Sequence, residues 1–179
     1  MLYSSNVNTK NTPIKSAVDA WFAKYLSGYD SYLEDTIFCN DRTIKSLGGW
    51  DSNGGAINQY LQFQEYSPSK DLSCDRATDQ FSTLNNSAKL TYKVGLMSNP
   101  EMNLLNNSKI RNTSQSYWLA SPDFFSDYNA RVRRVDTSGS LGGLNTLNSG
   151  GGLRPAVSIL PGTVYTSGDG SMASPFVIE

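Results

Sequence analysis

Few side chains in this sequence are suited to catalysis, and their spacing favours no particular reaction. The 179 residues include no histidine, which removes histidine general bases, Ser-His and Cys-His nucleophile pairs and histidine-containing metal sites. Both cysteines, Cys39 and Cys74, lie in the first half of the chain without the C-x-x-C spacing of zinc sites. Neither of the common glycine-rich phosphate-binding motifs occurs. The sequence therefore predicts no catalytic residue and no cofactor.

Carboxylates offer the remaining chemistry, either as acid–base pairs or as calcium ligands. Two groups of carboxylates occur, Asp30, Glu34 and Asp35 in one and Asp71, Asp75 and Asp79 in the other. Scattered carboxylates are usually solvated or capping groups, so we assign them no acid–base role. Residues 51–54 and Asp169-Gly170 carry oxygen ligands of the kind that Ca²⁺ prefers, but both stretches are typical of plain turns. No metal site is predicted.

The two cysteines leave two interpretations open. A disulfide between Cys39 and Cys74 would close a loop of roughly 35 residues and contribute about 3–4 kcal/mol in the loop-entropy estimate. Two small buried thiols are an equally common arrangement for a pair of cysteines. A Cα–Cα separation below about 7 Å in the folded domain would favour the disulfide.

Composition indicates one folded domain with a polar but weakly charged surface. Hydrophobic residues make up 38% and charged residues 17%, while an aromatic content of 11% is too high for a disordered chain. With 15 basic and 16 acidic residues the net charge is −1, so we expect no nucleic-acid partner. No apolar run is long enough to predict a membrane segment.

Local patterns predict short helices early in the chain and short strands late. Thr12-Pro13 starts an amphipathic helix that runs to residue 26, and Asn99-Pro100 starts a second helix through residue 105. Strands are predicted over residues 90–96, 117–122, 130–135, 153–160 and 175–178, with an exposed irregular loop over residues 142–152. The fold class is therefore α+β, with a small antiparallel sheet and a loop-rich C-terminal third. Within it we expect Trp118, Val132 and Val157 to be buried and Arg154 to hold loop carbonyls as a buried guanidinium.

Several stretches resemble one family. Residues 117–122 (YWLASP), 129–132 (NARV), 138–141 (SGSL) and 153–158 (LRPAVS) resemble the C-type-lectin-like domains of the formylglycine-generating-enzyme branch. That branch includes the variable proteins of diversity-generating retroelements. Upstream, residues 32–42 and 47–50 resemble an uncharacterised surface-domain family of gut bacteria from the same branch. The resemblance implies a single C-type-lectin-like domain over residues 14–179, preceded by an N-terminal segment or linker, 1–13.

The motifs that carry the branch's known activities are missing here. The enzymes of the branch use cysteines near the C-terminal end, and this chain has none after Cys74. Sugar-binding C-type lectins use a Glu-Pro-Asn or Gln-Pro-Asp calcium motif, which is also absent. Neither catalysis nor calcium-dependent sugar binding is therefore expected, and an enzyme of the formylglycine-generating type is the remote third reading.

The residue types after Leu119 bear on whether a retroelement diversifies this part of the gene. Mutation of adenines alone in Asn codons yields residues such as Tyr, Ser, Asp, Phe and Arg, but never Lys, Glu, Gln, Met or Trp. None of these five types occurs between Leu119 and Ser171, although they make up about one residue in five before that stretch. Turn chemistry explains the shortage of Lys and Glu in loops, but explains it less easily in strands. Residues 119–160 are therefore the candidate variable region.

The leading hypothesis is a non-catalytic display domain that binds a protein or glycan ligand outside the cell, on a cell surface or a phage particle, as in receptor binding or adhesion. The alternative is an invariant head domain of a pilus or bacterial surface polymer. We expect the isolated domain to be a monomer. The candidate ligand-binding residues are those that adenine mutation can reach outside the scaffold motifs: Phe125, Ser126, Asp127, Tyr128, Arg131, Arg133, Asn145, Thr146, Leu147 and Asn148.

Overall fold

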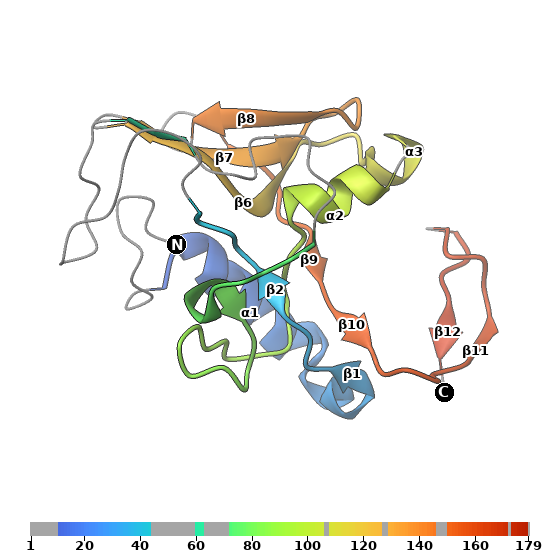
Figure 1. Ribbon diagram of the computed structural model, residues 1–179. Coiled ribbons are helices and arrows are strands. Elements are labelled where there is room, and N and C mark those ends of the chain that lie inside the picture. The colour runs from blue at the N-terminus through green and yellow to red at the C-terminus, as the bar shows by residue number, and fades with distance from the viewer. Residues whose placement is uncertain are drawn as a thin grey trace.

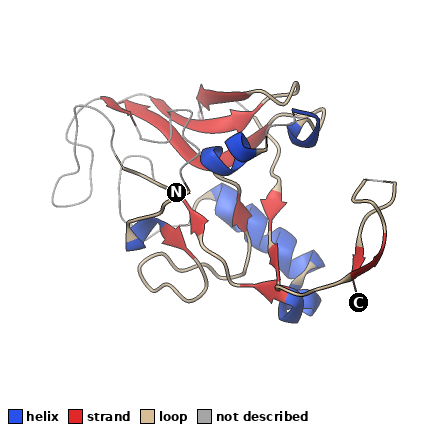
Figure 2. Cartoon of the chain, turned by 45° about the vertical axis from the view of Figure 1, so that its right-hand side comes forward, coloured by secondary structure: helices blue, strands red, loops and turns tan. Residues whose placement is uncertain are grey.

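The computed structural model describes residues 11–43, 60–62, 72–105, 108–126, 129–145, 150–171 and 173–178. These residues form a few short helices and several small antiparallel sheets, as Figure 1 shows. The predicted α+β class is confirmed. Figure 2 shows the first helix lying beneath the largest sheet, with the shorter strands around it.

The first helix, α1 (Pro13–Tyr25), begins where the sequence predicts. The Thr12 hydroxyl accepts a hydrogen bond of 3.2 Å from the backbone N–H of Lys15, and proline needs no donor at the first helical position. Val18 and Phe22 face inward at helical spacing. They form the first apolar cluster with two buried residues from other segments, Leu33 and Val94.

Short strand pairs join distant parts of the chain. They are β1 (Leu33–Glu34) with β10 (Ser158–Ile159), β2 (Phe38–Cys39) with β4 (Gln80–Phe81), and β5 (Gly95–Leu96) with β9 (Pro155–Ala156). A 3-10 helix over Ser27–Tyr32 precedes β1, and another over Ala77–Asp79 precedes β4. In each pair the two strands lie more than 40 residues apart in the chain, so the sheets hold the fold together through contacts distant in sequence.

Two predicted strands are shorter than expected. Of residues 90–96 only β5 is extended and paired, because a tight turn in which the Val94 N–H donates to the Tyr92 carbonyl interrupts the run. Residues 153–160 are divided between β9 and β10. Val157, which lies between them, is half-buried rather than buried as predicted.

A second helix, α2 (Asn99–Leu104), has a complete capping box. The Ser98 hydroxyl accepts from the Glu101 N–H, and the Glu101 carboxylate accepts from the Ser98 N–H at 2.6 Å. A short helix, α3 (Ser108–Arg111), follows. Beneath α2 lies the second apolar cluster, which consists of Met102, Tyr117, Leu119 and Val135.

The largest sheet has the strand order β3-β6-β7-β8 and is antiparallel throughout. Its strands are β3 (Tyr60–Gln62), β6 (Tyr117–Ser126), β7 (Asn129–Val135) and β8 (Leu141–Asn145). Trp118 and Val132 are buried, as predicted. The described residues after Gln115 contain no helix, which agrees with the predicted strand-rich C-terminal part.

Two features of this sheet correct the sequence analysis. The strand predicted to end in a turn at Pro122 continues to Ser126, because shifts of register on either side of Pro122 place its missing N–H at an irregular point of the ladder. The predicted loop over residues 142–152 instead begins as strand β8. Main-chain pairing such as Gly142 with Arg134 needs no side chain, so a glycine-rich segment can form an outer strand.

The glycine-rich segment after β8 also packs closely against the sheet. The Gly152 N–H donates to the Ser116 carbonyl, and the Trp118 N–H donates to the Gly152 carbonyl. A Cβ atom on Gly151 would lie 2.6 Å from Nε1 of the Trp118 indole, too close for any side chain without a shift. Glycine is therefore required at position 151 by the buried tryptophan beside it.

Arg154 differs from its predicted burial. It is exposed, although its guanidinium donates to the Ile110 carbonyl at 3.2 Å and to the Tyr117 hydroxyl at 3.1 Å. The guanidinium also lies 5.4 Å from the centre of the Tyr117 ring. Arg154 thus holds a carbonyl of helix α3 from the surface, and not loop carbonyls from a buried position as predicted.

The chain ends in a hairpin, β11 (Tyr165–Ser167) with β12 (Val177–Ile178). Figures 1 and 2 both show it standing apart from the other elements. Asp169 and Gly170 lie in its turn, in agreement with the predicted plain turn. In the part of the chain that the structure describes, no helix has the length and apolarity needed to span a bilayer.

Candidate functional site

Strand register brings several separate segments to one end of the large sheet. Ser126 pairs with Asn129 across the β6–β7 hairpin, and Arg131 pairs with Asn145. On the other side of β6, Tyr60 pairs with the same Ser126. We call this place the sheet end, and its described residues are 60–62, 124–126, 129–131 and 145. In Figure 1 it is the left-hand end of the sheet.

The predicted ligand-binding residues come from the segments that meet at the sheet end. Phe125 and Ser126 finish β6, Arg131 lies near the start of β7, and Asn145 ends β8. Arg133 lies two residues further along β7. For Phe125, Ser126 and Asn145 the structure describes the backbone alone. The other predicted positions, Asp127, Tyr128, Thr146, Leu147 and Asn148, lie outside the described residues.

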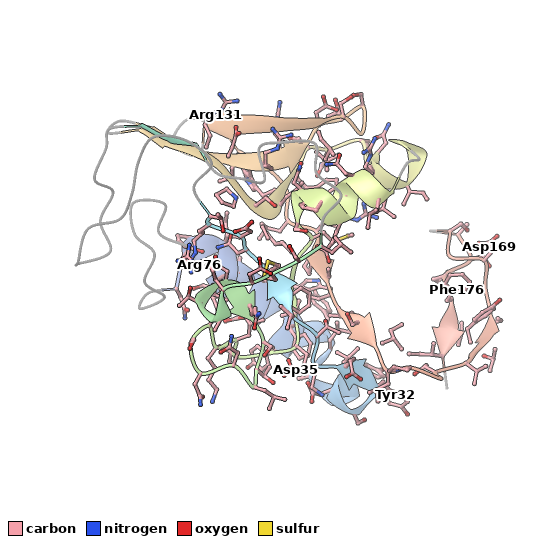
Figure 3. All side chains as sticks on the ribbon, in the orientation of Figure 1. Tyr32, Asp35, Arg76, Arg131, Asp169 and Phe176 are labelled. Carbon is pink, nitrogen blue, oxygen red and sulfur yellow. A yellow bond between two sulfur atoms is a disulfide. The ribbon has the colours of Figure 1, made fainter. Side chains whose placement is uncertain are left out.

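Next to the sheet end, Asp123, Arg131 and Arg133 form an ionic cluster around the buried Asp123 side chain. The Asp123 side chain is 0% exposed, with Arg131 Nε at 3.2 Å from Oδ2 and Arg133 Nη1 at 3.9 Å from Oδ1. Neither carboxylate oxygen accepts a hydrogen bond from the described residues. Burial raises the pKa of the Asp123 carboxyl, and the positive charges of Arg131 and Arg133 lower it to a smaller extent. Figure 3 labels Arg131 on the sheet.

This cluster changes the expected roles of the two arginines. The Arg133 side chain is 13% exposed and donates from Nε to the Asn99 side-chain oxygen at 3.2 Å, so it has little surface to display. Arg131 is 35% exposed and also pairs with Asp123. Loss of Arg131 would remove a positive charge that faces a buried carboxylate, so a change at this position affects the stability of the sheet as well as its surface.

A hydrogen-bonded support connects the cluster to α2. The Ser121 hydroxyl accepts from the Asn99 N–H at 2.7 Å, and both residues are fully buried. Asn99 in turn accepts from Arg133. Strands β6 and β7 are thereby fixed to the capped start of α2 through largely buried hydrogen bonds.

Comparison with known proteins gives one result. Residues 3–161 match the family described as "Domain of unknown function (DUF6273)". The chain belongs to the DUF6273 family. No curated protein and no solved structure matches it. The DUF6273 match covers the large sheet and the strand pairs, and it stops before the C-terminal hairpin.

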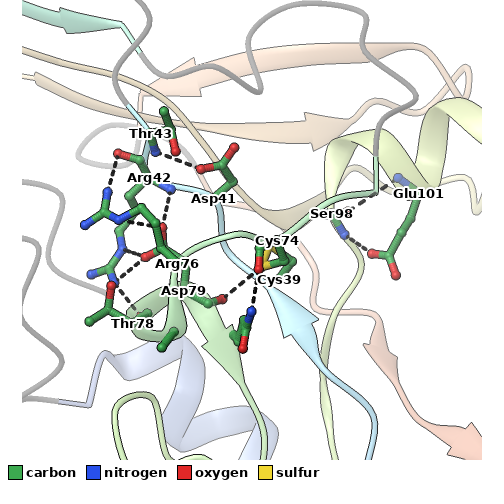
Figure 4. Close-up of a disulfide and its surroundings, with 12 residues drawn as sticks. Cys39, Asp41, Arg42, Thr43, Cys74, Arg76, Thr78, Asp79, Ser98 and Glu101 are labelled. Carbon is green, nitrogen blue, oxygen red and sulfur yellow. Dashed lines mark hydrogen bonds and ion pairs between the residues drawn. A yellow bond between two sulfur atoms is a disulfide. The ribbon is translucent and has the colours of Figure 1, made fainter.

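The DUF6273 region contains both cysteines, which form a disulfide. Cys39 and Cys74 are bonded, with a Cα–Cα separation of 6.0 Å, so the disulfide interpretation is confirmed. Beside it, as Figure 4 shows, the buried Arg42 guanidinium pairs with Asp79 at 2.5 Å and donates to the Thr78 carbonyl. Covalent and ionic links therefore join the same two segments, residues 38–43 and 74–81.

A shallow hollow of about 360 Å³ lies beside this disulfide in the DUF6273 domain. Its lining residues are Ile37, Cys39, Leu72, Ser73, Cys74, Ser98, Pro100 and Glu101. The Glu101 carboxylate already accepts a hydrogen bond as the helix cap. Among the described residues, no group of three or more His, Cys, Asp or Glu side chains is arranged to hold a metal ion. Residues 51–54, one of the two stretches weighed for calcium, lie outside them.

Sequence reasoning missed Asp123, which lies beside the sheet end, and strand β3, which forms part of it. Asp123 was not singled out, although an acid inside an apolar strand opposite alternating arginines is the signal of a cross-strand charge cluster. Strand β3 was also missed, because its partner lies more than 60 residues away and short strands carry weak local patterns.

Proposed function

We propose that this DUF6273 domain is a non-catalytic display domain of C-type-lectin-like fold, the variable protein of a diversity-generating retroelement. The observation that carries the proposal is the register of the sheet. Residues picked from the sequence because adenine mutation could produce them come from three segments, and Phe125, Arg131 and Asn145 from those segments meet at the sheet end.

The sheet end has the construction that a variable surface needs. Backbone hydrogen bonds set the register of β6, β7 and β8, and these bonds do not depend on side-chain identity. The buried side chains that hold the sheet, such as Tyr117, Leu119 and Val135, lie at the opposite end of the same strands. We therefore assign ligand binding to the sheet end and stability to the opposite ends of β6 and β7. Residues at the sheet end can then change while the buried residues stay constant.

The ligand class follows from the residue types. Tyr, Phe and Arg offer large contact areas with few torsions to freeze, and Ser and Asn add hydrogen bonds. This composition suits a protein surface or a glycan. A disulfide in a small domain is typical of oxidising compartments, which supports a location outside the cell or on a phage particle.

Sequencing the DNA around the gene tests the retroelement directly. We expect an adenine-rich near-copy of codons 119–160 beside a reverse transcriptase gene. Copies of the gene from related strains should differ mainly at adenine-bearing codons for residues 125–148. An invariant region with no reverse transcriptase nearby would contradict the proposal and favour the structural head domain.

A pair of libraries tests the display role without knowledge of the ligand. The first varies Phe125, Ser126, Tyr128 and Leu147 with the residues that adenine mutation yields. The control varies Tyr117, Leu119 and Val135 of β6 and β7 over the same residue set. We expect most members of the first library to resist protease as well as the parent does, and most members of the second to be degraded. Equal losses in both libraries would mean that the sheet end is core.

A further inference from the structure

The C-terminal hairpin is an arm that the rest of the domain does not cover. We define the arm as residues 160–178, from the end of β10 to the end of β12. Figure 3 labels Phe176 and Asp169 on it, well separated from the large sheet, while Tyr32 lies at its base. The Leu160 N–H donates to the Tyr32 carbonyl, which fixes where the arm leaves the domain. Most of the arm, including both strands, lies beyond the family match.

The arm has a specific structure of its own. Asp169 accepts from the Ser171 N–H at 2.9 Å, and the Asp169 and Gly170 N–H groups both donate to the Ser174 carbonyl. Gly170 has a φ of +79°, and a Cβ there would lie 2.6 Å from the Phe176 ring. These contacts hold the turn in one conformation, although a hairpin of two strands alone is only marginally stable in water.

Apolar side chains on the arm are left open to solvent. The Tyr165 and Phe176 rings lie 4.8 Å apart across the hairpin, yet they are 60% and 55% exposed. Val164 is 75% exposed, and Val177 and Ile178 are also exposed. Since an aromatic side chain carries roughly 150–250 Å² of surface, the arm offers on the order of 500 Å² of apolar area. An exposed apolar patch of that size is often functional.

The edges of the hairpin lack the charged side chains that usually protect an uncovered strand, although both strands are short and their register shifts between Tyr165 and Ser167. Edge strands are normally guarded by lysines or other charges, but Asp169 in the turn is the one charged residue in the sequence of residues 160–178. Within the described residues, β11 and β12 pair only with each other, so each has an outer edge that no other strand covers. The arm is therefore suited to accept a further strand.

We propose that the arm docks on the arm of a second copy of this chain. An apolar patch whose single charge, Asp169, lies in the turn meets its own copy with little charge repulsion, and an uncovered edge strand pairs antiparallel with itself across a two-fold axis. Two arms together would bury about 1,000 Å², which is the size that a specific interface must reach. The pairing would also supply the additional strands that a lone hairpin needs. A dimer of this kind differs from the monomer expected from the sequence, and the experiments below distinguish the two.

Sedimentation velocity over about 1–200 µM tests this pairing on the intact chain. We expect a concentration-dependent dimer. The variants Val164→Asp and Phe176→Asp should weaken dimerisation at least tenfold, because each places a charge in the interface. The matched control is Leu84→Asp, which alters a side chain that is 81% exposed on the body of the domain. Thermal melts establish that all three variants are folded.

Crosslinking gives a second measurement that does not depend on weakening the arm. With Thr166→Cys on β11, we expect mild oxidation to produce a covalent dimer, while Leu84→Cys should stay a single chain. A single-chain mass at every concentration would overturn the proposal. So would a dimer that persists in both arm variants, or one that Leu84→Asp disrupts equally.

Discussion

Asp123 has a side chain that water does not reach, and it faces the guanidinium groups of Arg131 and Arg133. Burial raises its pKa above the usual value, and Arg131 and Arg133 offset part of that increase. The folded domain therefore holds this proton more tightly than the unfolded chain does. A residue of this kind makes the stability of the sheet end depend on pH.

The sign of that dependence is a testable prediction. Stability from the raised pKa is fully present below the unfolded value of about 3.9, and it is lost as the pH rises through the folded pKa. Urea unfolding of the parent and of Asp123→Asn between pH 4 and pH 8 measures it. Relative to the Asn variant, the parent should become less stable as the pH rises. A parent that gains stability instead would mean that the arginines outweigh burial.

The contact between Gly151 and Trp118 predicts different outcomes for two neighbouring glycines. Gly151→Ala should cost about 1–3 kcal/mol, because its Cβ would press on the buried indole. Gly150→Ala is the control, since nothing lies within 4 Å of the added atom, and surface changes usually stay within about 0.5 kcal/mol. Chemical denaturation measures both. Equal effects would show that the loop moves away from Trp118 at little cost.

At the scale of elements, the start of α2 links helix capping to the sheet end. Ser98→Ala removes the side chain that accepts from Glu101 and should cost about 1 kcal/mol. The matched change Ser87→Ala, at an exposed serine away from the helix, should cost much less. Thermal melts compare the two variants. If Ser98→Ala proves neutral, the remaining contacts of α2 are enough to hold it in place.

Elements with local signals were predictable, and elements that depend on distant partners were not. Thr12-Pro13 and Asn99-Pro100 mark helix starts in the sequence, and both helices begin there. By contrast, β3 and β8 exist because of their partners, and nothing local distinguishes their residues from loops. The same limit applies to the candidate site. The absence of Lys, Glu, Gln, Met and Trp between Leu119 and Ser171 indicated the segments that form the site. The pairing of Arg131 with Asp123, by contrast, depends on the register between β6 and β7.

At the scale of the whole molecule, the disulfide should supply a large part of the stability. Replacing Cys39 and Cys74 together by Ser should lower the free energy of unfolding by about 3–4 kcal/mol. The two cysteines are 35 residues apart in the chain, and without the bond the unfolded loop between them regains its conformational freedom. The buried Arg42–Asp79 pair joins the same segments, so some of that region should remain folded. Guanidinium unfolding of the parent and the double variant measures the difference. A loss below about 1 kcal/mol would mean that the ion pair and packing suffice without the disulfide.

The same bond makes residues 39–74 a covalent ring, with β3 inside it and a tail leaving from each cysteine. A chain nicked anywhere between Asn40 and Ser73 stays in one piece for as long as the disulfide lasts. It would run as one band on a denaturing gel without reductant and as two bands after reduction. The ring is consequently a place where foreign sequence can be inserted, or the chain reopened with new termini, without separating α1 from the large sheet.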